Sequence, residues 1–128
     1  MLLGEDNAAD VFLVREALKL AGLDHELIVQ KDGEQMYRYI ERMEAGEAPC
    51  PDVVLLDLNL PKKNGEDLLV RIRESRLCGR VPVVIVTSSD LLKDRQTVAK
   101  LGATRYFHKA SDYDAFMKLG ALVQSLTS

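Results

Sequence analysis

The sequence predicts an α/β fold in which five parallel strands form a doubly wound sheet covered by five helices. Short apolar runs of strand length alternate with longer segments of helical period along the whole chain, and this alternation is typical of parallel sheets. The run over residues 81–86 is almost wholly apolar, as expected for a strand that is covered on both faces. The length of 128 residues suits one domain with a single core. We therefore expect residues 1–128 to form a single domain.

The start of the chain is expected to hold two strands with a helix between them. Leu2 and Leu3 look like the end of a first strand whose beginning is clipped. Residues 8–21 repeat apolar side chains at helical spacing and are followed by a glycine, which commonly ends a helix. Residues 26–30 have the sequence Glu-Leu-Ile-Val-Gln and are expected to form the second strand.

The middle of the chain is expected to contain two helices on either side of a buried strand. Residues 33–45 form the first of these helices, and a loop over residues 46–51 follows. Residues 53–56 are four apolar residues with a β-branched start, which indicates a third strand. Asn64 and Gly65 are typical of a turn, and a helix is expected over residues 66–77.

The last third of the chain repeats the same alternation. A fourth strand is expected over residues 81–86, and a helix over residues 91–101 is followed by a glycine. Residues 104–108 form a weaker fifth strand, and residues 112–126 carry the apolar stripe of a last helix. We find no internal repeat, low-complexity tract or linker in the sequence.

Composition argues against several classes of protein. The formal net charge of −3 and the pI near 5.4 argue against a nucleic-acid binder, which would normally be basic. Apolar runs fall short of the roughly 20 residues that a membrane helix needs, and the first residues do not form a signal peptide. Cys50 and Cys78 make no metal-ligand pattern, so we expect free thiols in a cytoplasmic protein.

An acidic residue follows the predicted strand over residues 53–56. In open α/β sheets, ligands bind outside the carboxyl ends of the strands, so Asp57 is expected to be a metal ligand, a nucleophile or both. The alternative is that Asp57 caps a loop or a short helical turn. Glu5 and Asp6 directly follow the first strand. If the strand order is 2-1-3-4-5, which the sequence alone does not establish, these carboxylates meet Asp57 in one crevice.

A cluster of three carboxylates predicts a bound cation. The three groups would repel one another and have raised pKa values unless a cation were present. Mg²⁺ fits best because it accepts a few carboxylates, keeps bound waters and often shares oxygen atoms with a phosphoryl group. Glu5 and Asp6 could instead cap the helix that follows, although Asn7 and Asp10 could also take that role.

Two other strand ends carry complementary groups. Thr87 follows the fourth strand, and its hydroxyl could donate to a phosphoryl oxygen. Lys109 follows the fifth strand and could pair with phosphate as a point charge. Taken singly, Thr87 is more typical of a cap and Lys109 of a solvated lysine. The combination of an acid pair, a lone acid, a hydroxyl and an ammonium at four strand ends indicates one site.

With these residues in view, the chain resembles the receiver domains of two-component response regulators over nearly its whole length. The matching segments are Gly4-Glu5-Asp6-Asn7, residues 55–61, Asn64-Gly65, residues 86–89, residues 101–103 and residues 106–109. The spaced set is specific, although each short piece alone is weak. The Glu-Asp-Asn-x-Ala-Asp start is similar to that of compact stand-alone receivers. The resemblance implies a flavodoxin-like fold with the strand order 2-1-3-4-5.

The resemblance also implies a role for each site residue. Asp57 would be the phosphoacceptor, attacking a phosphohistidine of a histidine kinase or phosphotransfer protein. The implied Mg²⁺ ligands are Glu5, Asp6, Asp57 and the backbone carbonyl of Asn59. Thr87 would donate to the phosphoryl group and Lys109 would pair with it. The protein would then be a signalling domain and not an enzyme, apart from its own phosphotransfer and dephosphorylation.

Phosphorylation is expected to switch the surface formed by residues 91–101, 104–108 and 112–126. Thr87 would move toward the phosphate, and Tyr106 would turn inward to fill the vacated space. The alternative reading of Tyr106 is a half-buried aromatic side chain on an edge strand. Leu91 and Leu92 cannot easily both face the core, so one exposed leucine would mark a surface for a partner or a homodimer. Ordinary surface scatter would explain it equally.

One departure from the family pattern concerns the residue after Lys109. This family usually has a proline there in a cis peptide, whereas this chain has Ala110. A cis bond before alanine would cost about 2.5–4 kcal/mol. We therefore expect either a trans bond with a shifted Lys109 or a strained cis bond.

Two other functions are considered for the same fold. A Mg²⁺-dependent phosphohydrolase would commonly carry a second acid two residues after the nucleophile, where this chain has Asn59. A flavodoxin-like binder would want a phosphate loop after the first strand, and the acidic pair found there has the opposite charge. The last helix is expected to end close to residue 128, which fits either a stand-alone regulator or a domain of a longer protein.

Overall fold

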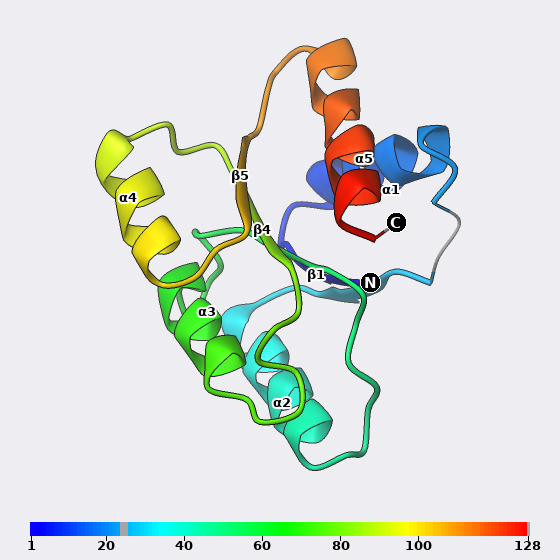
Figure 1. Ribbon diagram of the computed structural model, residues 1–128. Helices are drawn as coiled ribbons and strands as arrows, with labels where there is room; N and C mark the ends of the chain where they lie inside the picture. The colour runs from blue at the N-terminus through cyan, green and yellow to red at the C-terminus, as the bar shows by residue number, and fades with distance from the viewer. Residues whose placement is uncertain (24–25, 128) are drawn as a thin grey trace.

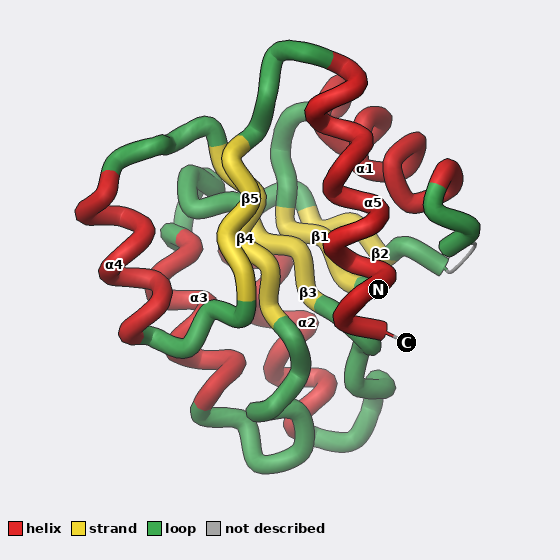
Figure 2. The backbone as a smooth tube through the Cα atoms, turned by 45° about the horizontal axis from the view of Figure 1, so that its top comes forward, coloured by secondary structure: helices red, strands yellow, loops and turns green. Residues whose placement is uncertain are grey.

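A parallel sheet of five strands lies at the centre of the computed structural model, which describes residues 1–23 and 26–127. The strand order is β2-β1-β3-β4-β5, so the order that was assumed from the sequence is confirmed. Figure 2 shows this sheet between layers of helices. The strands are β1 (Leu2–Gly4), β2 (Ile28–Gln30), β3 (Val54–Leu56), β4 (Val83–Thr87) and β5 (Arg105–His108).

Five helices lie against the sheet and cover both of its faces (Figure 1). Side-chain oxygens of Asn7, Asp32 and Asn64 cap the first three helices by accepting backbone N–H groups. Asn64 and Gly65 thus begin a helix and do not form an isolated turn. The helices are α1 (Ala8–Leu20), α2 (Gly33–Glu44), α3 (Gly65–Arg73), α4 (Leu92–Lys100) and α5 (Tyr113–Thr127).

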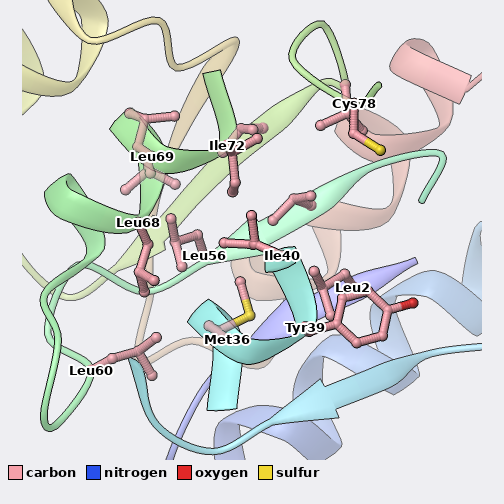
Figure 3. Packing of buried hydrophobic residues seen from close by; sticks show 14 of the residues in the cluster. Leu2, Met36, Tyr39, Ile40, Leu56, Leu60, Leu68, Leu69, Ile72 and Cys78 are labelled. Atoms are coloured by element: carbon pink, nitrogen blue, oxygen red, sulfur yellow. The ribbon is translucent and has the colours of Figure 1, made fainter. Parts of the chain in front are cut away.

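Alternating strand residues divide the core into two clusters. On one face Leu2, Leu56 and Ile85 pack against α2, α3 and α4. Figure 3 shows side chains of α2 and α3 meeting those of β1 and β3 in this cluster. On the other face Leu3 and Leu55 pack against α1 and α5. Both faces of the central strands are therefore buried, as their continuous apolar runs predict.

The ends of two elements differ from the sequence expectation around residues 74–82. Helix α3 ends at Arg73, although the helical pattern continued to residue 77. The side chain of Arg73 donates to the backbone carbonyls of Gly79, Val81 and Gly102. These bonds hold the loop after α3 against the C-terminal end of α3. Strand β4 begins only at Val83.

The expectation of free thiols is wrong. Cys50 and Cys78 form a disulfide; their Cα atoms are 5.5 Å apart, and the two residues are separated by 28 positions in sequence. Cys50 precedes β3 and Cys78 precedes β4, and these strands are parallel neighbours. Both cysteines therefore lie at the amino end of the sheet. Their spacing in the sequence does not reveal this proximity, which depends on how the strands pair.

The surface beside α4 also differs from the expectation. Both Leu91 and Leu92 are exposed, so neither joins the core. Leu91 stands at the N-cap position of α4 and makes no side-chain capping bond.

Among the described residues, no helix is long and apolar enough to cross a membrane.

Candidate functional site

The carboxyl ends of β1 and β3 bring three acidic side chains together. Glu5 follows β1 and is only 1% exposed, while Asp57 follows β3 and is 6% exposed. The backbone N–H of Asp57 donates to the carbonyl of Gly4 at 3.0 Å, so the two strand ends are directly joined. One carboxylate oxygen from each of Glu5, Asp6 and Asp57 lies within 4.8 Å of the others.

Lys109 enters this cluster from the end of β5. Its Nζ lies 2.6 Å from Glu5 Oε1 and 2.9 Å from Asp57 Oδ2. It also lies 2.9 Å from Oδ2 of Asp10, in the first turn of α1. The described residues contain no cis peptide bond, so the bond before Ala110 is trans. The trans alternative is therefore the one adopted, and Lys109 still contacts Asp57.

Asp10 is the residue of this cluster that the sequence reasoning missed, since it was considered only as a helix cap. Asn7 takes that role, because its side chain accepts the backbone N–H of Asp10 at 3.1 Å. The carboxylate of Asp10 is thus available to Lys109, from which it is separated by 99 positions in sequence. No local pattern in the sequence indicates this contact, because Asp6 precedes the N-cap of α1 and Asp10 lies in the first turn of the helix.

The electrostatics of the cluster depend on burial. Burial raises the pKa of Glu5 to about 7, with Lys109 acting in the opposite direction and the charge of Asp57 adding to the rise. For Lys109, burial acts to lower the pKa, but hydrogen bonds to Glu5, Asp10 and Asp57 outweigh it, so its pKa lies above the ordinary value. A single ammonium therefore stands among four carboxylates, counting Asp6.

This donor set fits a hard divalent cation. Glu5, Asp6 and Asp57 offer carboxylate oxygens, which Mg²⁺ and similar ions prefer. The single ammonium of Lys109 is outnumbered by the acidic groups around it. A cation would relieve the repulsion. Glu5 is buried and Asp6 is exposed, so the acidic side chains that would hold such an ion extend from the interior to the surface.

The loop after Asp57 is held in place by backbone contacts. The backbone N–H of Asn59 donates to Asp57 Oδ1 at 3.0 Å, and the N–H of Gly65 donates to the carbonyl of Leu58. A Cβ on residue 65 would lie 2.8 Å from the carbonyl oxygen of Asp57. Glycine at the start of α3 therefore allows the helix to approach the site closely.

Thr87 lies next to Asn59 at the end of β4, and Tyr106 lies on the neighbouring strand β5. Thr87 is fully buried, and its Oγ1 accepts the side-chain amide of Asn59 at 3.4 Å and the backbone N–H of Ser89 at 3.3 Å. The hydroxyl of Tyr106 donates to the carbonyl of Ser89 at 2.6 Å. The Arg95 guanidinium lies 4.6 Å from the centre of the Tyr106 ring. The Tyr106 side chain is half-buried, and its hydroxyl is hydrogen-bonded to the loop that follows Thr87.

The sequence of this chain is similar to those of known proteins. A family model described as the response regulator receiver domain matches residues 1–119. Response regulator Rcp1 from Synechocystis sp. (strain ATCC 27184 / PCC 6803 / Kazusa) is 36% identical over 126 residues, which cover 98% of this chain and 86% of Rcp1.

The fold is also similar to those of solved response regulator structures. The phosphorylated cyanobacterial phytochrome response regulator RcpA matches with a TM-score of 0.89 at 32% identity, over 99% of this chain and 92% of RcpA. The Mn²⁺-bound form of Rcp1 matches with a TM-score of 0.85 at 36% identity, over 97% of this chain and 90% of that structure.

Proposed function

The chain belongs to the response regulator receiver family, and on that premise we propose that Asp57 accepts a phosphoryl group from a histidine kinase or phosphotransfer protein. Receiver domains are signalling domains and not classical enzymes. The observation that carries the proposal is the position of Asp57 at the end of β3, in contact with Lys109 and beside Glu5 and Asp6. A carboxylate with these neighbours has both a nucleophilic oxygen and partners for the incoming charge.

In the proposed reaction, a carboxylate oxygen of Asp57 forms a bond to phosphorus as the bond from phosphorus to the donor imidazole nitrogen breaks. The imidazole leaves with the electron pair of that bond. Such transfers depend mainly on positioning and on stabilising charge on the phosphoryl oxygens. Lys109 supplies a half-buried positive charge 2.9 Å from Asp57, and the backbone N–H of Asn59 holds Oδ1 of Asp57 in a fixed direction.

Glu5, Asp6 and Asp57 would hold a divalent cation, which we propose to be Mg²⁺, and the backbone carbonyl of Asn59 would add a ligand. When bound, the ion would neutralise charge on phosphoryl oxygens. The donor set supports this assignment, because one carboxylate oxygen from each of the three residues lies within 4.8 Å of the others. We expect cation binding to displace any proton on Glu5.

Thr87 and Tyr106 are proposed to report phosphorylation to the surface. The hydroxyl of Thr87 would turn to donate to a phosphoryl oxygen, giving up its contacts with Asn59 and Ser89. Because Tyr106 donates to the carbonyl of Ser89, movement of that loop would change the packing of Tyr106. The shift would then reach the surface of α4, β5 and α5.

Leu91 and Leu92 border that surface, and we propose that it contacts a partner or a second copy of the chain. Both side chains are exposed beside Arg95, which covers the ring of Tyr106. Sedimentation with and without a beryllofluoride phosphate mimic tests the homodimer. A chain that stays monomeric at high concentration in both states would exclude it.

A phosphohydrolase is the competing function, and the site gives it little support. Asn59 occupies the position where such an enzyme would carry its second acid, and its amide is engaged with Thr87. An amide cannot transfer a proton to a leaving group at neutral pH. Sustained release of p-nitrophenol from p-nitrophenyl phosphate would favour the enzyme over the receiver.

Labelling by acetyl phosphate tests the receiver directly. We expect the intact mass of the protein to increase by one phosphoryl group in the presence of Mg²⁺, and not in Asp57→Asn. Asp52→Asn is the matched control, because Asp52 is an exposed acid at the other end of the same strand. Equal labelling of the wild type and Asp57→Asn would contradict the assignment of Asp57.

A further inference from the structure

Asp10 is the acid of the cluster that the proposed phosphotransfer does not use. It is 24% exposed at the side chain and contacts the Lys109 ammonium at 2.9 Å. Asn7 caps α1, so Asp10 is not needed for that purpose. The three N–H groups of the ammonium face three carboxylates, those of Glu5, Asp10 and Asp57.

Lys109 needs a fixed partner because its backbone alone does not direct its ammonium. The backbone N–H of Lys109 donates to the carbonyl of Thr87 at 2.7 Å, which fixes the end of β5. Four rotatable side-chain bonds lie between that point and Nζ. Two of the three carboxylates on Nζ also change during the reaction, since Glu5 would be taken by the cation and Asp57 by the phosphoryl group. Asp10 is the carboxylate on Nζ that neither the cation nor the phosphoryl group would take.

We propose that Asp10 is a positioning residue that holds the Lys109 ammonium against α1, within reach of the phosphoryl group on Asp57. One N–H of Lys109 stays on Asp10 while those on Asp57 and Glu5 pass to phosphoryl oxygens or solvent. This inference rests on the proposed function of Asp57. It goes beyond that function by assigning a role to a residue of α1 that touches neither phosphorus nor the cation.

A simpler role for Asp10 would be electrostatic support of α1, since acids near a helix amino end are favourable. A double-mutant cycle separates the two roles. The variants are Asp10→Asn, Lys109→Met and the double variant, with Glu16→Gln as the matched control for removing an acid from α1. The rate constant for phosphorylation by acetyl phosphate is measured at saturating Mg²⁺, with the Mg²⁺ affinity of each variant titrated first and folding checked by thermal unfolding.

We expect Asp10→Asn to slow phosphorylation about tenfold when Lys109 is present, because a misdirected charge loses most of its effect on the transferring group. In the Lys109→Met background the same substitution should change the rate by less than about twofold. Glu16→Gln should leave the rate unchanged, and Asp10→Glu, which keeps the carboxylate, should recover most of the wild-type rate.

An equal loss in both backgrounds, or no loss in either, would overturn the positioning role. Failure of Asp10→Glu to recover any of the rate would also overturn it, because the negative charge would then not be the active feature. Failure of the underlying function looks different, since the wild type itself would then take no label on Asp57. A wild type that is labelled while Asp10→Asn reacts normally refutes only the role of Asp10.

Discussion

The buried carboxylate of Glu5 makes the stability of the protein depend on pH in a direction opposite to that of most acids. Burial raises its pKa from the ordinary value of 4.5 to about 7. At a pH between 4.5 and about 7, Glu5 is mostly ionised in the unfolded chain and mostly protonated in the folded chain. The folded state then binds more protons than the unfolded state, so the contribution of Glu5 to stability falls as pH rises.

The size of this effect follows from the two pKa values. Each unit of difference corresponds to about 1.4 kcal/mol, so the full difference is about 3 kcal/mol, as an upper limit. Little solvent screening reduces it, because Glu5 is 1% exposed. The contribution is fully present below pH 4.5, declines up to about pH 7 and is then constant. Mg²⁺ should shrink the decline, because it favours the ionised carboxylate.

Urea unfolding of the wild type and Glu5→Gln, followed from pH 4.5 to 8.5, measures this dependence. Far-UV circular dichroism is the suitable signal, since the chain has no tryptophan. Subtracting the two free energies of unfolding removes the titration of groups that do not interact with Glu5. We expect the wild-type advantage to fall by about 3 kcal/mol between pH 4.5 and 7. A difference that is constant, or that grows with pH, would refute the raised pKa of Glu5.

Two further predictions concern stability away from the site. Arg73→Met removes charged hydrogen bonds to three backbone carbonyls and should lower the free energy of unfolding by about 3 kcal/mol in urea, whereas the exposed Arg80→Met should have little effect. Equal effects of the two substitutions would contradict the role of Arg73. The disulfide between Cys50 and Cys78 spans 28 positions, so its reduction should cost about 3.5 kcal/mol through loop entropy. Wild type and Cys50→Ser should unfold alike in dithiothreitol and differ without it, and identical midpoints without reductant would contradict the bond.

The parts of the fold that depend on chain pattern were predictable from the sequence. Apolar runs separated by amphipathic segments of helical length lead to a parallel sheet, and the observed order places β1 beside β3. That single adjacency brings Glu5 and Asp6 to Asp57. Element ends were less predictable, because tertiary contacts such as those of Arg73 decide where α3 stops.

Contacts between distant segments were not predictable from a single sequence. The pairing of Cys50 with Cys78 depends on two loops that meet only once the strands pair. The contact between Asp10 and Lys109 joins α1 to the end of β5, and neither residue carries a local pattern that indicates it. The isomer of the peptide bond before Ala110 could not be predicted either. The bond is trans, and the long side chain of Lys109 still reaches Asp57.

We propose that Asp57 stores a phosphoryl group as an acyl phosphate. Borohydride reduction after labelling with acetyl phosphate and Mg²⁺ identifies the phosphorylated residue, because hydride converts a phosphorylated aspartate to homoserine and leaves free carboxylates unchanged. Peptide mass mapping should find homoserine at position 57 and nowhere else in the cluster. Homoserine at position 6 or 10, reduction of Glu5 to its corresponding alcohol, or no reduced residue at all would refute the assignment of Asp57 as the phosphoacceptor.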